Sequence, residues 1–482
     1  MKIKSKYSLV AVTVLMLVVL GCNSSKTTLQ DEVINDGKKY SPVSFSDTTK
    51  DTVTIADVNW KKVFSDPNLV ALIDTALKNN QELNITLQEI QIAKSEARVR
   101  TGEYLPQAGL KLGAGVEKPG EFTRDGAVEK QLEVEPGKAF PEPLGDFMVG
   151  AYFSWEVDIW KKLRNSKKSA VSRYLASIEG KNFMITNLVA EIAGSYYELV
   201  ALDNQLEIIN KNIEIQSSVL NVVKQQKDAG RVSQLAINRF EAQLLNTQNL
   251  QYDIKQQIVE TENKINFLVG RFPQPVSRDA ATFNDIELDS VYIGVPTQLL
   301  QNRPDIRKAE QELVAAKLDV KVAKASFYPS LSIRANVGMN AYNPGVWFNP
   351  QSLLFNLLGD IVAPLINRNA LKANSMSANA KQVQAAYNYQ QTILKAYTEV
   401  VNQLSGIRNY TSSYNTKSKE VEILNQSVTI SNNLFSSARA DYMEVLLTQR
   451  EALQSRMELV EIKLKQMNSK VGVYKALGGG WK

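Results

Sequence analysis

The chain has 482 residues, a net charge of +6, a single cysteine at position 22 and no histidine. Histidine bases and metal sites built from histidine and cysteine are therefore excluded, and we expect no enzyme, no catalytic residue, no metal and no cofactor. No basic cluster is interleaved with aromatic residues and no internal stretch reaches the roughly 18 apolar residues of a membrane helix, so we expect no nucleic-acid partner, and any crossing of a bilayer would use strands.

Residues 1–22 have the pattern of a signal peptide. Three lysines lie within the first six residues, and an apolar stretch follows as far as Leu20. The run Val19-Leu20-Gly21-Cys22 resembles a lipobox, in which Cys22 is acylated and becomes the mature N-terminus. We therefore predict lipidation at Cys22, and the alternative is ordinary signal cleavage with an incidental cysteine.

Residues 60–270 form the first of two similar units. A helix ends at the corner Tyr104-Leu105-Pro106, and two segments of alternating polarity follow around a loop of residues 118–146. A long tract without proline comes next, and its apolar residues recur at the three-four spacing of a coiled coil. We predict strands at about 107–117 and 147–158 and long helices at about 162–229 and 233–268.

Residues 297–477 repeat this order, with the corner Phe327-Tyr328-Pro329. Here the predicted strands are about 330–339 and 352–362, and the predicted long helices are about 369–437 and 441–477. The match of Glu241-Ala242 with Glu451-Ala452 extends the repeat and pairs Gly230 with Ala440. Two copies of this size indicate a duplicated domain half.

The long helices have the dimensions of struts. A helix of roughly 65 residues is about 100 Å long, well beyond the diameter of a compact domain. Each strut is expected to turn back at a tip, at Gly230-Arg231 in the first unit and at Ala440-Asp441 in the second. Most of the apolar stripes along these helices are expected to be simple helix packing.

The four predicted strands each have one apolar face and about the length of a tilted transmembrane strand. Alternation of this kind also suits two hairpins that cover a soluble core, and the lipidation signal favours the membrane interpretation. An open four-stranded sheet leaves backbone groups unpaired in lipid, so several copies would have to pool their strands into a barrel. Oligomerisation is thus a requirement of the membrane interpretation.

Three motifs carry a resemblance to a known family. They are residues 60–67 (WKKVFSDP), residues 300–310 (LQNRPDIRKAE) and residues 476–481 (ALGGGW). The chain resembles the TolC-like outer membrane efflux proteins, in particular the lipidated NodT-type branch that works with resistance-nodulation-division pumps.

The resemblance implies a mostly α fold with a small transmembrane β-barrel contribution, made of long coiled-coil hairpins and four β-strands per protomer. Three protomers would form a 12-stranded barrel in the cell outer membrane and a periplasmic α-helical tunnel. Residues 23–59, the linker 271–296 and the tail 478–482 would contribute to an equatorial belt. Partners would be two further copies of the chain, outer membrane lipid, a periplasmic adaptor protein and an inner-membrane pump.

The family's periplasmic gate maps onto Met443, Glu444, Leu447 and Arg450. Met443 matches an apolar constriction, Glu444 and Leu447 match positions where acidic residues occur, and Arg450 matches a basic partner. Leu447 departs from that pattern, so we predict a more hydrophobic constriction with Glu444 as its acidic ring. The alternative is that Glu444 and Arg450 are ordinary solvated charges. The tips Gly230, Arg231, Ala440 and Asp441 would contact the adaptor.

The resemblance implies a passive outer-membrane conduit that exports small molecules delivered by an inner-membrane pump. No glycine-rich phosphate cradle followed by Lys-Ser or Lys-Thr occurs in the sequence, so energy must come from a partner. Two alternatives stay open at this point: the outer-membrane component of a type I protein secretion system, and a lipid-anchored coiled-coil scaffold without a pore.

Overall fold

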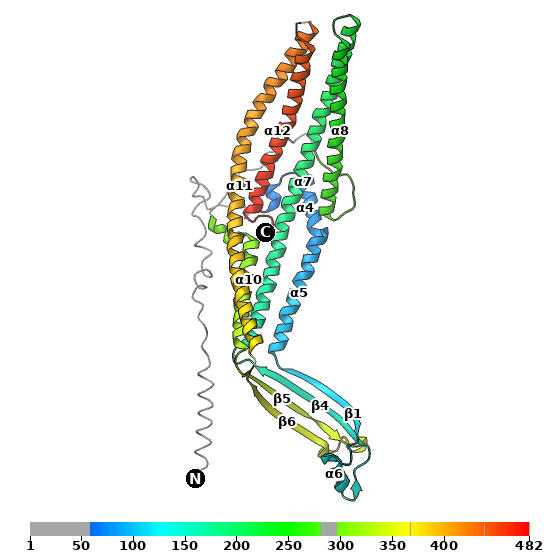
Figure 1. Ribbon diagram of the computed structural model, residues 1–482, viewed down its shortest axis with the longest axis vertical. Coiled ribbons are helices and arrows are strands. Elements are labelled where there is room, and N and C mark those ends of the chain that lie inside the picture. Colours follow the sequence, from blue (N-terminus) through cyan, green and yellow to red (C-terminus); the bar gives the residue numbers. More distant parts are fainter. Residues whose placement is uncertain (1–57, 280–282, 284–295, 367, 438, 482) are drawn as a thin grey trace.

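The computed structural model describes residues 58–279, 283, 296–366, 368–437 and 439–481. Cys22 and the signal segment lie outside the described residues, as do nearly all of the predicted belt segment 23–59 and most of the linker. Residues 271–279 and 478–481 are described, and both lie midway along the helical part (Figure 1).

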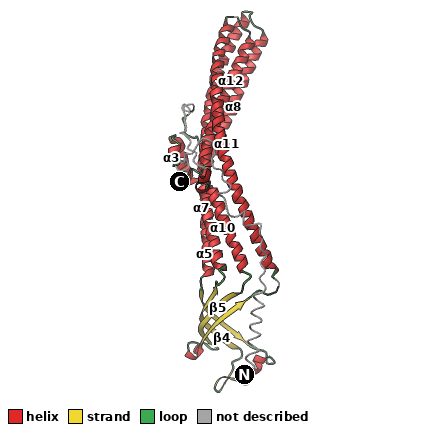
Figure 2. Cartoon of the chain, turned by 90° about the vertical axis from the view of Figure 1, so that its left-hand side faces the viewer, coloured by secondary structure: helices red, strands yellow, loops and turns green. Residues whose placement is uncertain are grey.

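Four long helices form the upper part of an elongated molecule, and a twisted sheet forms its lower end (Figures 1 and 2). The long helices are α7 (Lys162–Asp228), α8 (Gln234–Val269), α11 (Asn369–Ser436) and α12 (Tyr442–Ala476). At 67 residues, α7 is about 100 Å long, the strut length that the sequence predicts. None of the helices in the described part of the chain is both long and apolar enough to pass through a bilayer.

The long helices pair as two antiparallel hairpins, α7 with α8 and α11 with α12, and α12 also packs on α7. In the lower half, α5 (Gln81–Tyr104) and α10 (Pro304–Ala325) flank α7, and α10 also contacts α11. The short helices α3 (Trp60–Val63), α4 (Pro67–Asn79) and α9 (Leu299–Asn302) lie at mid-height. The largest apolar core lies there too, and it includes Phe64 and Tyr474, whose rings meet edge to face at 6.0 Å.

The sheet is antiparallel with the strand order β1-β4-β5-β6. Its strands are β1 (Gln107–Glu117), β4 (Leu144–Val157), β5 (Ser330–Ala341) and β6 (Leu353–Val362). The register places Val149 opposite Leu112 on one side and opposite Met339 on the other, and Met339 opposite Leu353. Paired residues share a face, so the alternation in all four strands adds up to one continuous apolar face. The sheet is open, with β1 and β6 at its edges.

The loop between β1 and β4 is more structured than the sequence predicts. It contains the helix α6 (Arg124–Gln131) and a small hairpin of β2 (Glu133–Glu135) and β3 (Lys138–Ala139). The Thr123 hydroxyl accepts a hydrogen bond from the Gly126 N–H at 3.2 Å, which caps α6. The shorter β5–β6 loop has only two 3-10 turns, Pro344–Val346 and Pro350–Ser352.

The turn from β4 into α7 is organised by Asp158. Its carboxylate accepts hydrogen bonds from the Leu163 and Arg164 N–H groups at 3.0 and 2.9 Å, and from the Arg164 guanidinium at 3.1 Å. Burial works to raise the pKa of this carboxyl, but these hydrogen bonds outweigh it and leave the pKa below its usual value. Asp158 therefore stays charged and stabilises the positive end of α7.

Internal duplication is visible at mid-height in two matching helix ends. α8 is followed by Gly270 and α12 by Gly478, both with positive φ, at +77° and +87°. A Cβ at either position would lie 2.5 Å from a backbone oxygen, that of Asn79 or Asn302 respectively. Only glycine fits such a backbone at so close an approach, so the two positions are structurally equivalent.

Candidate gate at the helix tips

The two helix hairpins turn at the end of the molecule that is furthest from the sheet (Figure 1). In the first turn Gly230 has φ +71°, and the Arg231 N–H donates to the Gln226 carbonyl at 2.8 Å. In the second, the Arg439 N–H donates to the Leu434 carbonyl, also at 2.8 Å. The two hydrogen bonds are equivalent, because each joins an N–H group to the carbonyl five residues earlier, at the C-terminal end of a helix.

This hydrogen bond corrects the predicted pairing of Gly230 with Ala440. Arg231 corresponds to Arg439 and not to Asp441, so the sequence match is wrong by two residues at the tips. Asp441 is instead the N-cap of α12, where its carboxylate accepts from the Met443 N–H at 3.2 Å, and Ser233 holds the N-cap position of α8. The Glu-Ala match misled because a match of two residues recurs by chance along helices of this length.

The four predicted gate residues share the exposed side of α12. Met443 and Leu447 are 41% and 46% exposed, and Glu444 and Arg450 are exposed as well. Val445, Gln449 and Ala452, which lie between them in sequence, are buried and form the packed side of the helix. Within the described residues neither Glu444 nor Arg450 forms an ion pair. A single chain encloses no pore, so it remains a prediction that these four side chains line a gate.

An apolar cluster just behind the tips joins the two hairpins. Phe240 of α8 and Phe435 of α11 contribute rings whose centroids lie 6.4 Å apart. The other buried members of the cluster are Leu220, Val223, Ala236, Ile237 and Val445. Because Val445 belongs to this cluster while its neighbours Met443 and Leu447 are exposed, movement of one hairpin relative to the other would displace Met443 and Leu447 directly.

Arg239 is a further residue at the tips that sequence reasoning missed. Its guanidinium on α8 contacts the sulfur of Met443 on α12 at 2.6 Å, and it spans the two hairpins. No local pattern distinguishes Arg239 from other exposed cations on coiled-coil surfaces, so the sequence held no signal for it.

Lower on the second hairpin, Lys417 links α11 to α12. Its ammonium group lies 2.8 Å from Glu458 of α12 and 2.9 Å from Glu420 of its own helix. Ser455 of α12 donates to Glu420 at 2.9 Å. These hydrogen bonds raise the pKa of Lys417 and lower the pKa of both carboxyls, so all three groups remain charged across the neutral range.

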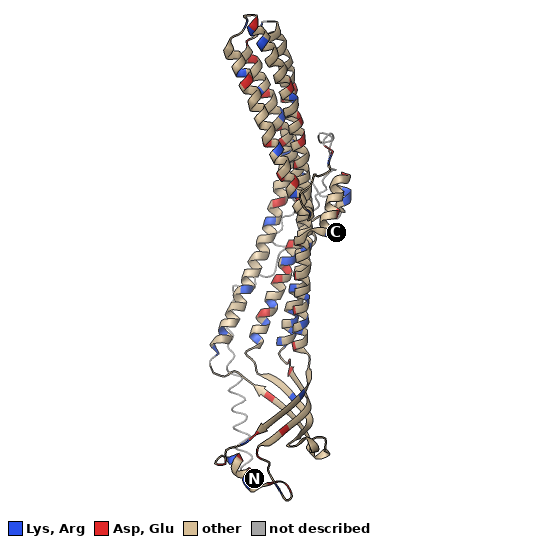
Figure 3. Cartoon of the chain, turned by 90° about the vertical axis from the view of Figure 1, so that its right-hand side faces the viewer, with Lys and Arg blue, Asp and Glu red and all other residues tan. Residues whose placement is uncertain are grey.

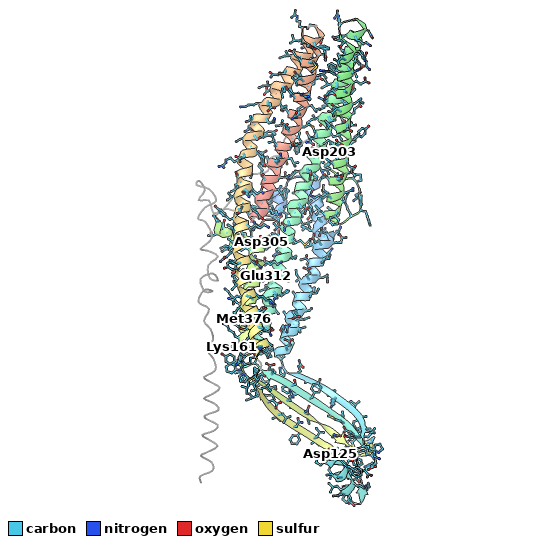
Figure 4. The ribbon with its side chains drawn as sticks, in the orientation of Figure 1. Asp125, Lys161, Asp203, Asp305, Glu312 and Met376 are labelled. Carbon is cyan, nitrogen blue, oxygen red and sulfur yellow. The ribbon has the colours of Figure 1, made fainter. Side chains whose placement is uncertain are left out.

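Arg303, within the motif of residues 300–310, holds α10, α11 and α12 together at mid-height. Its guanidinium pairs with Asp305 through two nitrogens at 3.0 and 2.6 Å, with Glu399 of α11 at 2.8 Å, and with the Ala476 carbonyl at 2.9 Å. Figure 4 marks Asp305 at this level of the molecule. In the first repeat the Asn80 amide takes the equivalent place and donates to the Leu268 carbonyl at 2.8 Å.

The family model described as "Outer membrane efflux protein" matches residues 72–271 and 295–479. The pyoverdine export outer membrane protein OpmQ of Pseudomonas aeruginosa is 28% identical over 424 residues, which are 88% of this chain and 87% of the relative. The cation efflux system protein CusC of Escherichia coli is 26% identical over 449 residues, 91% of this chain and 93% of the relative.

Solved structures give the same picture of the fold. The open state of the MtrE outer membrane channel of Neisseria gonorrhoeae superposes with a TM-score of 0.80 at 20% identity, covering 92% of this chain and 96% of that one. A CusC structure superposes with a TM-score of 0.78 at 23% identity, covering 92% and 97%.

Helical struts of this length, continued by an open sheet with one apolar face, make up the fold that this chain shares with solved outer-membrane channels. The chain belongs to the outer membrane efflux protein family, because the family model covers well over half of it. It is the outer-membrane component of an efflux system, as the family model and the two relatives indicate.

Proposed function

We propose that three copies of this chain form a passive conduit, which receives small molecules from an inner-membrane pump through a periplasmic adaptor protein. The main observation behind this proposal is that both flanks of the described part of the chain are left without a partner. At the sheet, the edge strands β1 and β6 each have one side that pairs with no other strand among the residues that the structure describes. Backbone groups in lipid must be paired, so neighbouring copies complete a closed barrel of 12 strands.

The helical part has matching unpartnered stripes on its two outer helices. On α8, Leu245, Tyr252 and Val259 are 59%, 66% and 49% exposed, and they follow one another at intervals of seven residues. On α11, Ile423 and Ile430 are 62% and 58% exposed at the same interval. A seven-residue apolar spacing is the seam of a coiled coil, so α8 of one copy has the pattern to pack against α11 of the next.

The gate of this conduit would lie at the tips of the helices. Met443 and Leu447 would form its apolar constriction, Glu444 its acidic ring, and Arg450 a basic partner below. The exposed tips, with Gly230, Arg231, Ala440 and Asp441 among their residues, would be the surface that the adaptor contacts. A ring of like charges on a narrow pore attracts cations and repels anions, so Glu444 would set the ion preference.

The relatives favour export of small solutes over secretion of polypeptides. Their names refer to pyoverdine, to toluene and to cations. A scaffold without a pore has no specific observation in its favour. We also propose that the chain itself carries out no catalysis, since it lacks histidine entirely and its single cysteine falls in the lipobox.

Ion selectivity in planar lipid bilayers tests the gate. The wild-type trimer should prefer cations, Glu444→Gln should lose most of that preference, and Leu447→Glu should strengthen it. Glu461→Gln is the matched control, because Glu461 is an exposed glutamate further along the same helix. If Glu444→Gln leaves the cation preference unchanged, Glu444 does not line the pore.

A further inference from the structure

Basic residues are concentrated where the helices meet the sheet. Residues 95–104, 158–168, 317–325 and 368–372 together contain twelve lysines and arginines and only four acidic residues, a net charge of +8. The whole chain carries +6, including three leader lysines, so the rest of the mature chain is net negative. We call these twelve residues the basic collar, and Figure 3 shows lysines and arginines gathered at the lower ends of the helices. They are Arg98, Arg100, Lys161, Lys162, Arg164, Lys167, Lys168, Lys317, Lys321, Lys324, Arg368 and Lys372.

The acidic residues of this region are already engaged. Glu96 and Glu103 pair with Arg100, Asp158 pairs with Arg164, and Asp319 pairs with Arg173. Several collar lysines are left over, exposed and without an ion-pair partner among the described residues. Four of them are Lys161, Lys168, Lys321 and Lys324. Positive charge is therefore in excess and available to an external anion.

The collar lies at a fixed and short distance from the ends of the strands. Lys161 directly precedes α7, and Lys168 is seven residues further, which corresponds to about 10 Å along the helix. Lys324 and Lys321 lie within the last five residues of α10. Figure 4 shows Lys161 at the junction itself. Since the headgroup layer of a bilayer extends on the order of 5 to 8 Å beyond its hydrocarbon core, the collar reaches the height of the headgroups.

Aromatic and aliphatic side chains separate the collar from the apolar face of the sheet. Trp160 stacks on Tyr328 with ring centroids 4.7 Å apart, and its indole N–H donates to the Pro329 carbonyl at 2.8 Å. Leu365 and Ile366, between β6 and α11, are 76% and 90% exposed. A cleft of about 210 Å³ at this level is lined by Trp160 and Tyr328, by residues at the ends of β4, β5 and β6, and by the charged side chains of Asp158 and Lys162. The order of apolar strands, aromatic rings and then lysines is the profile of a membrane interface.

We propose that the basic collar binds the phosphodiester headgroups of anionic glycerophospholipids, such as phosphatidylglycerol, in the leaflet of the outer membrane that faces the periplasm. Charge complementarity selects the headgroup. The exposed aliphatic side chains of Leu365 and Ile366 favour a lipid over free phosphate, because they offer contacts only to its acyl portion. Binding fixes how deeply the barrel sits in the bilayer, and it is independent of the gate at the opposite end of the molecule.

The test measures lipid selectivity of the full-length trimer in mixed bilayers. Trimers are reconstituted into nanodiscs of phosphatidylethanolamine with about one-fifth phosphatidylglycerol, and the bound lipids are counted by native mass spectrometry. The collar variant replaces Lys161, Lys168, Lys321 and Lys324 with glutamine. The control variant makes the same four-charge change at exposed lysines on the distal parts of the long helices: Lys224, Lys227, Lys419 and Lys465.

The wild type and the control should retain phosphatidylglycerol in excess of its share, and the collar variant should lose at least about fivefold in relative affinity, the effect of one lysine at a charged membrane surface. The excess in the wild type should also disappear at about 1 M salt, where charges are screened beyond roughly 3 Å. This measurement uses the wild type alone, so it does not depend on whether a variant folds. Glycerol 3-phosphate in solution should not displace the lipid. An equal excess in the collar variant, no excess in the wild type, or full displacement by glycerol 3-phosphate would each overturn the proposal. None of these outcomes would affect the proposed conduit, which is tested separately by conductance and ion selectivity.

Discussion

Replacement of Arg303 by methionine tests the idea that one buried guanidinium joins three helices. The Arg303 side chain is 4% exposed and makes four hydrogen bonds, two to Asp305 and one each to Glu399 and the Ala476 carbonyl. Removal of one partner from a buried ion pair costs about 3–5 kcal/mol. Here the orphaned carboxylates of Asp305 and Glu399 are 16% and 35% exposed, so water can satisfy them in part. We therefore expect a loss of about 2–3 kcal/mol.

The assay is thermal unfolding of the detergent-solubilised trimer, followed by helical circular dichroism. Arg303→Met should unfold at the lowest temperature. Arg303→Lys, which keeps the charge but not the planar fork, should lie between it and the wild type. Asn80→Ala, at the equivalent place in the first repeat, removes only uncharged hydrogen bonds and should cost about 1–2 kcal/mol. If Arg303→Met unfolds at the wild-type temperature, or if it is milder than Asn80→Ala, the account of Arg303 as a junction is refuted.

Three further predictions concern the helix ends and the gate. Gly478→Ala should destabilise the protein more than Gly230→Ala, because both glycines have positive φ but only the first would place a Cβ 2.5 Å from a backbone oxygen; expression level and thermal midpoint of the two variants decide. Phe240→Ala, at a 1% exposed position, should cost about 3 kcal/mol and raise the open-channel conductance, whereas Phe267→Ala, 77% exposed on the same helix, should do neither. The lowered pKa of Asp158 gives stability that is present above its unfolded pKa and is lost as pH falls through the folded value, so the midpoint difference between wild type and Asp158→Asn should be full above about pH 4 and shrink below it.

Local periodicity determined the elements of this protein. The three-four spacing of apolar residues predicted the long helices, and the structure has them at Lys162–Asp228 and Asn369–Ser436, within a residue of the predicted ends. Alternation predicted the strands, and their registers turn it into one apolar face. Both patterns are visible within a few residues, because side-chain direction repeats about every 3.6 residues in a helix and every two residues in a strand. The loop between β1 and β4 lacked such a pattern, and its helix and hairpin were missed.

Only the tertiary structure decided how distant segments meet. The equivalence of Arg231 with Arg439 emerged from a shared hydrogen bond, after the sequence match had pointed two residues away. The bonds of Arg303 to Glu399 and Ala476, and the contact of Arg239 with Met443, join residues that are far apart in the chain. Such contacts depend on where whole helices pack, and exposed positions on a coiled coil leave them no local trace. The sequence alone therefore determined the struts, the strands and their apolar faces, whereas the junctions between them were decided by packing.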